Sequence, residues 1–364
     1  MLTPEHHRME ARGISLTLDL VNGHIAGLVV ERETRVLRPL HRAPWVDSGE
    51  TLPDKTPSGL ARLSGDFFCA PFSRNDLEDA PGHGWPANAP WSPMADEPIA
   101  GGRRATFRLS RTVFGATVEK ALTLRDGHPF IYQEHRLIGG TGGISVSHHL
   151  MTHMETGGLL AFSPKRLALT PDTPLEPDPA RGRYALRYPA QVEDLAAFPL
   201  ADGRTTDLRT YPPAEQHEDF LTLAEAPGEA LGWTTINRHA ERDQLIVLKQ
   251  SDVLPVTMLW MSNGGRDYAP WNGRHTGVLG IEDARASASG HAASISDNAL
   301  TRQGIATAFT LGQGDVVVRQ VFGATPLENT HDAVATVDAD GGVLVVTFEN
   351  GGRTELPFDP DFLR

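Results

Sequence analysis

Apolar and polar residues alternate along much of the chain, and short turn sequences separate the alternating stretches. Apolar residues occupy every second position from Ile14 to Leu20, Asn22 and Gly23 follow, and a second apolar run fills residues 25–31. Alternation on both sides of an Asn-Gly dipeptide predicts a β-hairpin, because successive side chains of a strand point to opposite faces.

The same pattern recurs over residues 104–140 and 341–358. No segment sustains an apolar i, i+3, i+4, i+7 stripe over three turns, so no long amphipathic helix is expected. The 36 glycines and 27 prolines are spread along the chain instead of marking one linker. We therefore expect an all-β sandwich or barrel with few short helices, in a single domain over residues 1–364, with proline-rich surface loops at 170–180 and 198–214.

Composition and charge narrow the class of partner. The 364 residues carry a net charge of −13, which argues against nucleic acid or an anionic membrane surface, since both attract clustered cations. No apolar run approaches the roughly 18 residues of a membrane span. The single cysteine, Cys69, excludes an internal disulfide, and the N-terminal residues lack a signal-peptide pattern. A cytoplasmic protein that binds a small molecule is the expectation.

Several frequent catalytic motifs are missing, so the candidate chemistry rests on three other segments. The sequence has no Gly-x-Ser-x-Gly elbow, Gly-Lys phosphate loop or Gly-x-Gly-x-x-Gly fingerprint. In the first segment, Arg74 follows an apolar strand and His83 lies between two glycines, where a ligand can approach the backbone closely. Trp85 and Trp91 fit no regular period. They either offer flat faces to a sugar ring or anchor a turn over an open end of the sheet.

The second segment, residues 144–154, contains three histidines. Alternation predicts a strand, on which His148 and His149 face opposite sides. The four-residue spacing of His149 and His153 suggests a metal site, but Leu150 stands where the metalloprotease motif needs glutamate. A metal site is therefore disfavoured, and each histidine is either a packed structural residue or a proton donor, because imidazole titrates near neutrality.

The third segment, residues 256–283, is a strand, a polar aromatic loop and a second short strand. Trp271 in the loop is a candidate for binding the substrate. Glu282 and Asp283 follow the apolar run "VLGI", so we expect them at a strand end that is partly removed from water, where a carboxyl pKa rises. The alternative is a solvated strand terminus. A lyase or hydrolase using Asp267 and Tyr268 is a weaker alternative.

Taken together, these segments resemble the aldose 1-epimerase (galactose mutarotase) family, most closely its hexose-6-phosphate epimerase-like branch. The family shows a His-Gly-aromatic-x-x-Asn-x-x-Trp loop, then a strand with a histidine, then a late Gly-Ile-Glu. Here these are "HGWPANAPW" at residues 83–91, "SVSHHL" at 145–150 and "LGIED" at 279–283. The preceding "RLSGDFFCAPFS" is similar to an arginine-containing strand of the family. The resemblance covers nearly the whole chain and implies a galactose mutarotase-like β-supersandwich of large antiparallel sheets.

The resemblance also implies roles for individual residues. Glu282 would be the catalytic base, His149 the acid, and His83 would position and polarise the sugar near its ring oxygen. Arg74 or Arg62 would hold sugar hydroxyls or an anionic substituent.

Two departures from the family pattern leave alternatives open. Leu150 replaces the proline that the family often shows after its histidine, so the choice between His148 and His149 stays open. "WPAN" replaces the more usual "FARN", and the missing arginine weakens the case for a phosphorylated sugar. The "QHEDF" sequence is similar to an aspartate-bearing loop of the family, which makes Asp219 a further candidate for binding a sugar hydroxyl.

The implied activity is interconversion of the α and β anomers of an aldose by acid–base ring opening at C1. This chemistry needs one base and one acid, and neither a metal nor another cofactor. The alternative is a non-catalytic sugar-binding or sensory protein on the same fold. The expected partner is a hexose or modified hexose, the protein being a monomer or homodimer; the sequence identifies neither the sugar nor its phosphorylation state.

Overall fold

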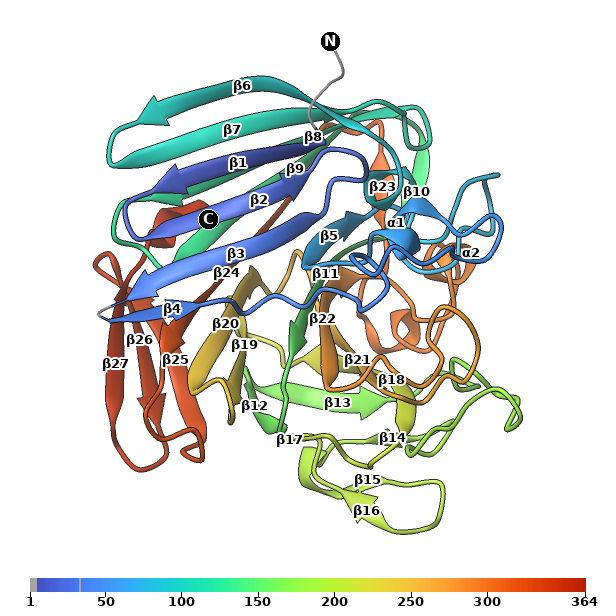
Figure 1. Ribbon diagram of the computed structural model, residues 1–364. Coiled ribbons are helices and arrows are strands. Elements are labelled where there is room, and N and C mark those ends of the chain that lie inside the picture. The colour runs from blue at the N-terminus through green and yellow to red at the C-terminus, as the bar shows by residue number, and fades with distance from the viewer. Residues whose placement is uncertain (1–4, 33) are drawn as a thin grey trace.

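Two large antiparallel sheets dominate the computed structural model, which describes residues 5–32 and 34–364 (Figure 1). The first sheet has 11 strands, with β4 (Arg35–Leu37) paired to β3 beside the main path. The other ten lie in the order β1 (His6–Ala11), β2 (Ile14–Asp19), β3 (Ile25–Arg32), β5 (Asp66–Cys69), β11 (Val146–His153), β22 (Val278–Arg285), β21 (Val256–Asn263), β18 (His217–Glu225), β13 (Lys165–Leu169) and β14 (Gln191–Val192).

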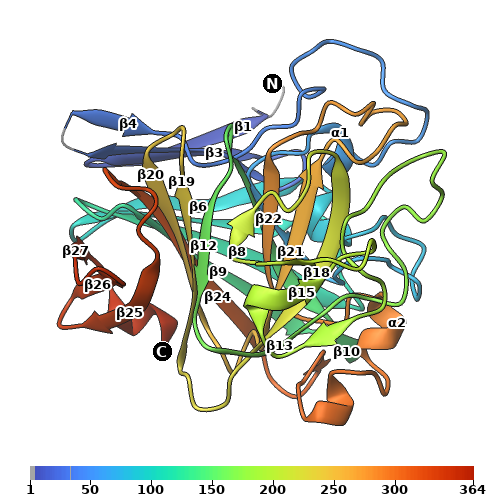
Figure 2. The same ribbon diagram turned by 90° about the horizontal axis from the view of Figure 1, so that it is seen from below.

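The second sheet has nine strands and packs against one face of the first (Figures 1 and 2). Its order is β17 (Thr210–Tyr211), β12 (Gly158–Phe162), β19 (Leu231–Arg238), β20 (Asp243–Gln250), β24 (Val316–Pro326), β9 (Phe130–Gly139), β8 (Ala116–Arg125), β7 (Gly102–Leu109) and β6 (Trp91–Ile99).

Three smaller sheets and a few short helical turns complete the described structure. A three-stranded sheet near the C-terminus contains β25 (Val334–Asp340), β26 (Val343–Phe348) and β27 (Arg353–Pro357), and two pairs are β10 (Gly142–Ile144) with β23 (Phe309–Leu311) and β15 (Phe198–Pro199) with β16 (Thr205–Thr206). The helices are α1 (Ser58–Ala61), α2 (His291–Ser294) and 3₁₀ turns at Trp85–Ala87, Leu195–Ala197, Thr301–Gln303 and Pro360–Leu363. None of the helices in the described ranges has the length and apolar character needed to cross a bilayer.

The strand alternation divides the buried apolar side chains into three layers. The main core lies between the two large sheets, for example Phe68 of β5 and Phe107 of β7. A second core lies between the nine-stranded sheet and the C-terminal sheet. The third lies on the other face of the first sheet, beneath long loops, and includes Phe67 of β5 and Trp260 of β21. The candidate site is built into this third layer.

The structure confirms the expected all-β class and the hairpins. Strands β2 and β3 pair antiparallel across the turn at Asn22 and Gly23, and β26 pairs with β27. The prediction of loops over residues 198–214 was wrong in part, because β15, β16 and β17 lie there. Glu282 and Asp283 were expected at a strand end but lie inside β22 and are almost fully buried.

Candidate active site

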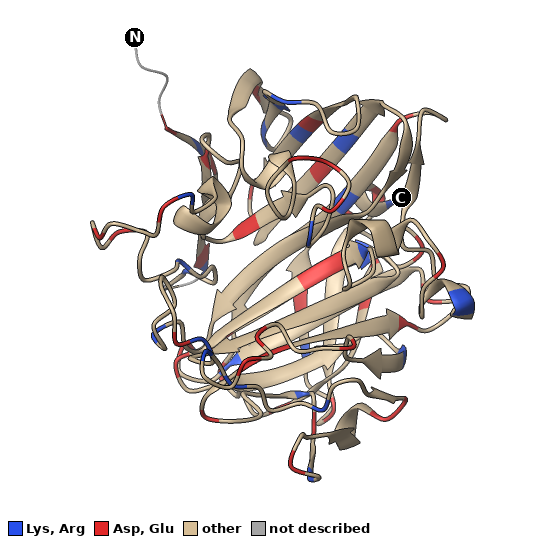
Figure 3. Cartoon of the chain, turned by 90° about the vertical axis from the view of Figure 1, so that its right-hand side faces the viewer, with Lys and Arg blue, Asp and Glu red and all other residues tan. Residues whose placement is uncertain are grey.

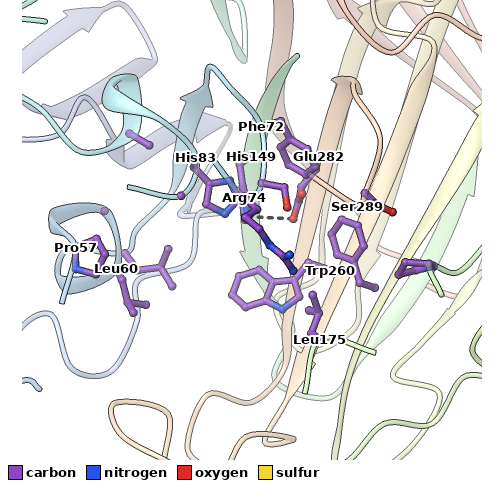
Figure 4. Close-up of a pocket in the computed structure, with 18 of the residues that line it drawn as sticks. Pro57, Leu60, Phe72, Arg74, His83, His149, Leu175, Trp260, Glu282 and Ser289 are labelled. Atoms are coloured by element: carbon purple, nitrogen blue, oxygen red, sulfur yellow. Dashed lines mark ion pairs between the residues drawn. The ribbon is translucent and has the colours of Figure 1, made fainter. Parts of the chain in front are cut away.

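A histidine and a glutamate from neighbouring strands meet on the loop-covered face of the first sheet. Strands β11 and β22 pair antiparallel, with Leu150 opposite Ile281. Successive side chains of a strand point to opposite faces, so His149 and Glu282, each next to one of these two residues, point together to the loop-covered face. His149 Nε2 lies 3.0 Å from Glu282 Oε1, and both side chains are buried (Figure 4). Glu282 Oε2 has no hydrogen-bond partner among the described residues. One carboxylate oxygen therefore holds the imidazole, while the other is buried at the cavity wall without a hydrogen bond from the described residues.

Burial favours the neutral form of each partner. It raises the pKa of Glu282 well above its ordinary value and lowers the pKa of His149 well below 6.5. A proton lost by one group is readily taken up by the other across a short hydrogen bond, so the two titrate as a pair. The pair holding one proton can accept one proton and donate another without a net change of charge.

The next residue along the strand points the other way. His148 lies between the two large sheets, beside His135 and Phe68 at ring-centroid distances of 5.1 and 5.4 Å. Burial lowers its pKa to about 3. Of the two adjacent histidines, the structure therefore places His149 at the cavity and His148 in the core.

His83 reaches the same place from the loop after β5. Its Nδ1 lies 3.4 Å from Cys69 Sγ, and its ring centroid lies 5.3 Å from that of His149 (Figure 4). Burial lowers the pKa of His83 to about 4, so the ring is neutral near pH 7. Gly84 is required beside it: its φ is +72°, and a Cβ there would lie 2.0 Å from the Ala70 carbonyl oxygen.

The two tryptophans of this loop brace it and do not line the cavity. Trp91 is buried, and its Nε1 donates to the Pro86 carbonyl at 3.0 Å. Trp85 packs against the main core. Asn88 orders the loop instead: its amide nitrogen donates to the carbonyls of Gly82 and Gly84, and its oxygen accepts from the Gly59 N–H of α1.

The side chains of His83, His149 and Glu282 form one end of a cavity of about 570 Å³. Two candidates from the sequence, Trp271 and Arg74, line it. The lining residues that the sequence analysis did not single out include Phe67, Phe72, Trp260 and Arg266. Basic and acidic residues are interspersed along the loops on this side of the molecule (Figure 3). The arrangement suits a neutral polar ligand that also has an apolar face.

Two of the expected sugar-binding residues lie outside the cavity, and these assignments are corrected. Arg62 is held by Asp19, at 2.6 Å, and by Glu5, at 3.1 Å. Asp219 lies on the opposite face of β18 from Phe220, which lines the cavity. The carboxylate of Asp219 accepts hydrogen bonds from Ala185 N, Leu186 N, the Tyr188 hydroxyl and His217.

Asp267 and Tyr268, the residues considered for a lyase or hydrolase, also have structural roles. Asp267 pairs with Arg183 at 2.8 Å, and the Arg181 guanidinium lies over the Tyr268 ring. Neither Asp267 nor Tyr268 lines the cavity. Among the described residues, no group of three or more His, Cys, Asp or Glu side chains is arranged to hold a metal ion.

Comparison with known proteins gives similarity of structure but not of sequence. No protein-family model matches the sequence, and neither does any curated protein. A proposed aldose 1-epimerase from Escherichia coli superposes with a TM-score of 0.57 at 11% identity, covering 88% of this chain and 99% of that one.

Two further solved structures agree. A proposed mutarotase from Salmonella typhimurium gives a TM-score of 0.53 at 13% identity, covering 90% of this chain and 95% of that one. A galactose mutarotase-related enzyme from Lactobacillus acidophilus gives 0.50 at 9% identity, covering 89% and 99%. The chain therefore has the galactose mutarotase-like fold. At these identities the similarity concerns the fold alone, and function rests on the site.

Proposed function

We propose that the protein is an aldose 1-epimerase, which interconverts the α and β anomers of an aldose. The observation that carries the proposal is the buried contact between His149 and Glu282 at the end of a sugar-sized cavity. A protein that only bound a sugar would have no need of a proton-sharing pair at this place. The mutarotase-like fold of the compared structures supports the proposal.

The reaction follows from the proton positions. The pair reacts in the form in which its shared proton lies on His149, so that Glu282 is a carboxylate and His149 an imidazolium. The Glu282 carboxylate takes the proton of the anomeric hydroxyl, and the O1 electron pair forms the C1=O1 bond as the C1–O5 bond breaks. His149 donates its proton to O5, which leaves an open-chain aldehyde. After rotation about C1–C2, O5 attacks the other face of C1 and both protons return. His83, neutral and next to His149, orients the sugar near O5.

Freshly dissolved α-D-glucose and α-D-galactose test the proposal by polarimetry. The purified protein is expected to accelerate the decay of optical rotation toward the equilibrium value for at least one of these sugars, in proportion to protein concentration. Sugar binding without acceleration would instead support the non-catalytic sugar-binding alternative.

The two adjacent histidines provide a matched pair of variants. Replacing His149 by Phe removes the proton donor at the cavity and should lower kcat by at least about 100-fold. Replacing His148 by Phe changes a ring that faces the core and should keep kcat within about threefold of the wild type. Polarimetry on both variants, with circular dichroism as a check of folding, measures the contrast. Equal losses in two folded variants would argue against the assigned acid.

The pH profile should show the effect of burial. The active pair holds one proton, so activity falls at low pH when His149 and Glu282 together gain a second one. Because burial lowers the pKa of His149, the midpoint of this acid limb should lie below 6.5. The alkaline limb, where the shared proton is lost, should lie above 4.5 because burial raises the pKa of Glu282. An acid limb of kcat/KM centred at or above pH 6.5 would contradict this account.

A further inference from the structure

Arg266 is the cation in the inner wall of the cavity, and aromatic rings fix its position. Its guanidinium carbon lies 4.5 Å from the ring centroid of Trp271 and 6.0 Å from that of Trp260. All three side chains line the cavity. A guanidinium held against aromatic faces presents its N–H groups in a fixed plane, so its donors point in few directions.

Behind Arg266 lies a buried carboxylate that the sugar cavity does not expose. Glu218 Oε1 is 3.2 Å from Arg266 Nη2 and accepts a hydrogen bond of 2.5 Å from Trp260 Nε1. Its Oε2 accepts from the Ser262 hydroxyl at 2.8 Å. Burial raises the pKa of Glu218, while the Arg266 charge and these two hydrogen bonds oppose that rise. Since tryptophan and arginine can only donate, Oε1 serves as an acceptor.

Two buried histidines continue this chain of contacts away from the cavity. Ser262 Oγ lies 2.7 Å from His275 Nδ1, and His275 Nε2 lies 3.0 Å from His41 Nε2. Because the Ser262 hydroxyl donates to Glu218, it accepts from His275 Nδ1–H, and His275 Nε2 then accepts from His41 Nε2–H. One consistent set of donors and acceptors thus orients the Glu218 carboxylate from behind.

The charges around the cavity balance when the contact between Arg266 and Glu218 is included. Arg266 is compensated by Glu218. Apart from Glu282, the remaining charged lining residues are Arg74 and Asp172, which are exposed and carry opposite charges. A phosphate bound at the inner wall would need an uncompensated cation there. A neutral hydroxyl needs only a donor, and Arg266 retains donors beyond the one facing Glu218.

We propose that Glu218 is a positioning residue that orients Arg266 and neutralises its charge, so that the cavity selects an uncharged aldose over a phosphorylated one. The inference rests on the proposed function for the identity of the ligand. The effect of the Arg266 charge on ligand binding does not depend on catalysis, and binding measurements therefore test it.

The test compares the dissociation constants of D-glucose and D-glucose 6-phosphate, measured by isothermal titration calorimetry. In the wild type D-glucose should bind more tightly. Glu218→Gln keeps the size of the side chain and an acceptor for Trp260 but leaves the Arg266 charge uncompensated. It should shift the ratio of the two constants toward the phosphorylated sugar by at least about tenfold, which corresponds to about 1.4 kcal/mol. Inorganic phosphate, which needs no sugar contacts, should show the same gain.

A double variant, Glu218→Gln with Arg266→Gln, is the matched control. It leaves no buried charge unpaired, so it should fold even if the single variant does not. Its ratio should return to within about threefold of the wild type. Tighter wild-type binding of D-glucose 6-phosphate, an unchanged ratio in folded Glu218→Gln, or a phosphate gain that persists in the double variant would overturn the proposal. If the ratio shifts but the wild type shows no mutarotation, the charge inference stands and the enzymatic proposal fails.

Discussion

Replacing Glu282 by Gln is expected to lower kcat for anomer interconversion by about 1,000-fold while leaving the fold intact. Glutamine has nearly the same size and can still accept a hydrogen bond from His149 Nε2, which lies 3.0 Å from Oε1 in the wild type. It cannot take the proton of the anomeric hydroxyl. General-base catalysis by a positioned side chain contributes about 10²–10⁴-fold, and the carboxylate has no substitute in the described part of the cavity that contacts the same imidazole.

Polarimetry gives the rate, and thermal unfolding of the same preparation checks that the variant is folded. Sugar binding by Glu282→Gln should stay within about tenfold of the wild type, because the loss is expected in the chemical step. A folded variant that keeps more than about a tenth of the wild-type kcat would show that Glu282 is not the base.

Replacing the neighbouring Asp283 by Asn is expected to destabilise the fold by about 3–5 kcal/mol. Asp283 points between the two sheets, where its carboxylate lies 3.0 Å from Lys249 Nζ and accepts hydrogen bonds from Thr257 and Gln320 at 2.8 Å each. Lys249 also contacts Glu225, at 3.0 Å, and all of these groups are buried. The buried ammonium group of Lys165 also contacts Glu225, at 2.6 Å. Without the Asp283 charge, Lys165 and Lys249 would therefore share the single carboxylate of Glu225.

Urea unfolding of Asp283→Asn and Glu282→Gln distinguishes the roles of the two faces of β22. Asp283→Asn should lower the free energy of unfolding by several kcal/mol, whereas Glu282→Gln should change it by less than about 1 kcal/mol. Equal destabilisation by the two substitutions would mean that Glu282 also has a structural role.

Local alternation in the sequence predicted the features that depend on a single strand or hairpin. It predicted a strand within residues 144–154, on which His148 and His149 face opposite sides, and the structure has this strand from Val146 to His153. It also placed a strand before Glu282. Period-two alternation is a property of the backbone itself, so no knowledge of the partner strand is needed.

Features that depend on strand register could not be predicted in this way. Arg62 contacts Asp19, which lies on a strand far from it in the sequence. The sequence around either residue does not indicate this contact. In "QHEDF" the sequence indicated that one acidic residue matters, but the register of β18 turns Asp219 away and brings Glu218 to Arg266. The sequence gives neither the register nor the loop path that carries Arg266 into the cavity wall.

Exchange NMR on a sugar at anomeric equilibrium shows whether the protein interconverts the two anomers. In the presence of the wild-type protein, magnetisation should pass between the α and β anomeric protons faster than in buffer, with no new sugar product formed. The acceleration should disappear with Glu282→Gln at the same concentration. Broadened or shifted sugar resonances without faster exchange, across D-glucose and D-galactose, would contradict the account and identify a protein that binds sugars without interconverting them.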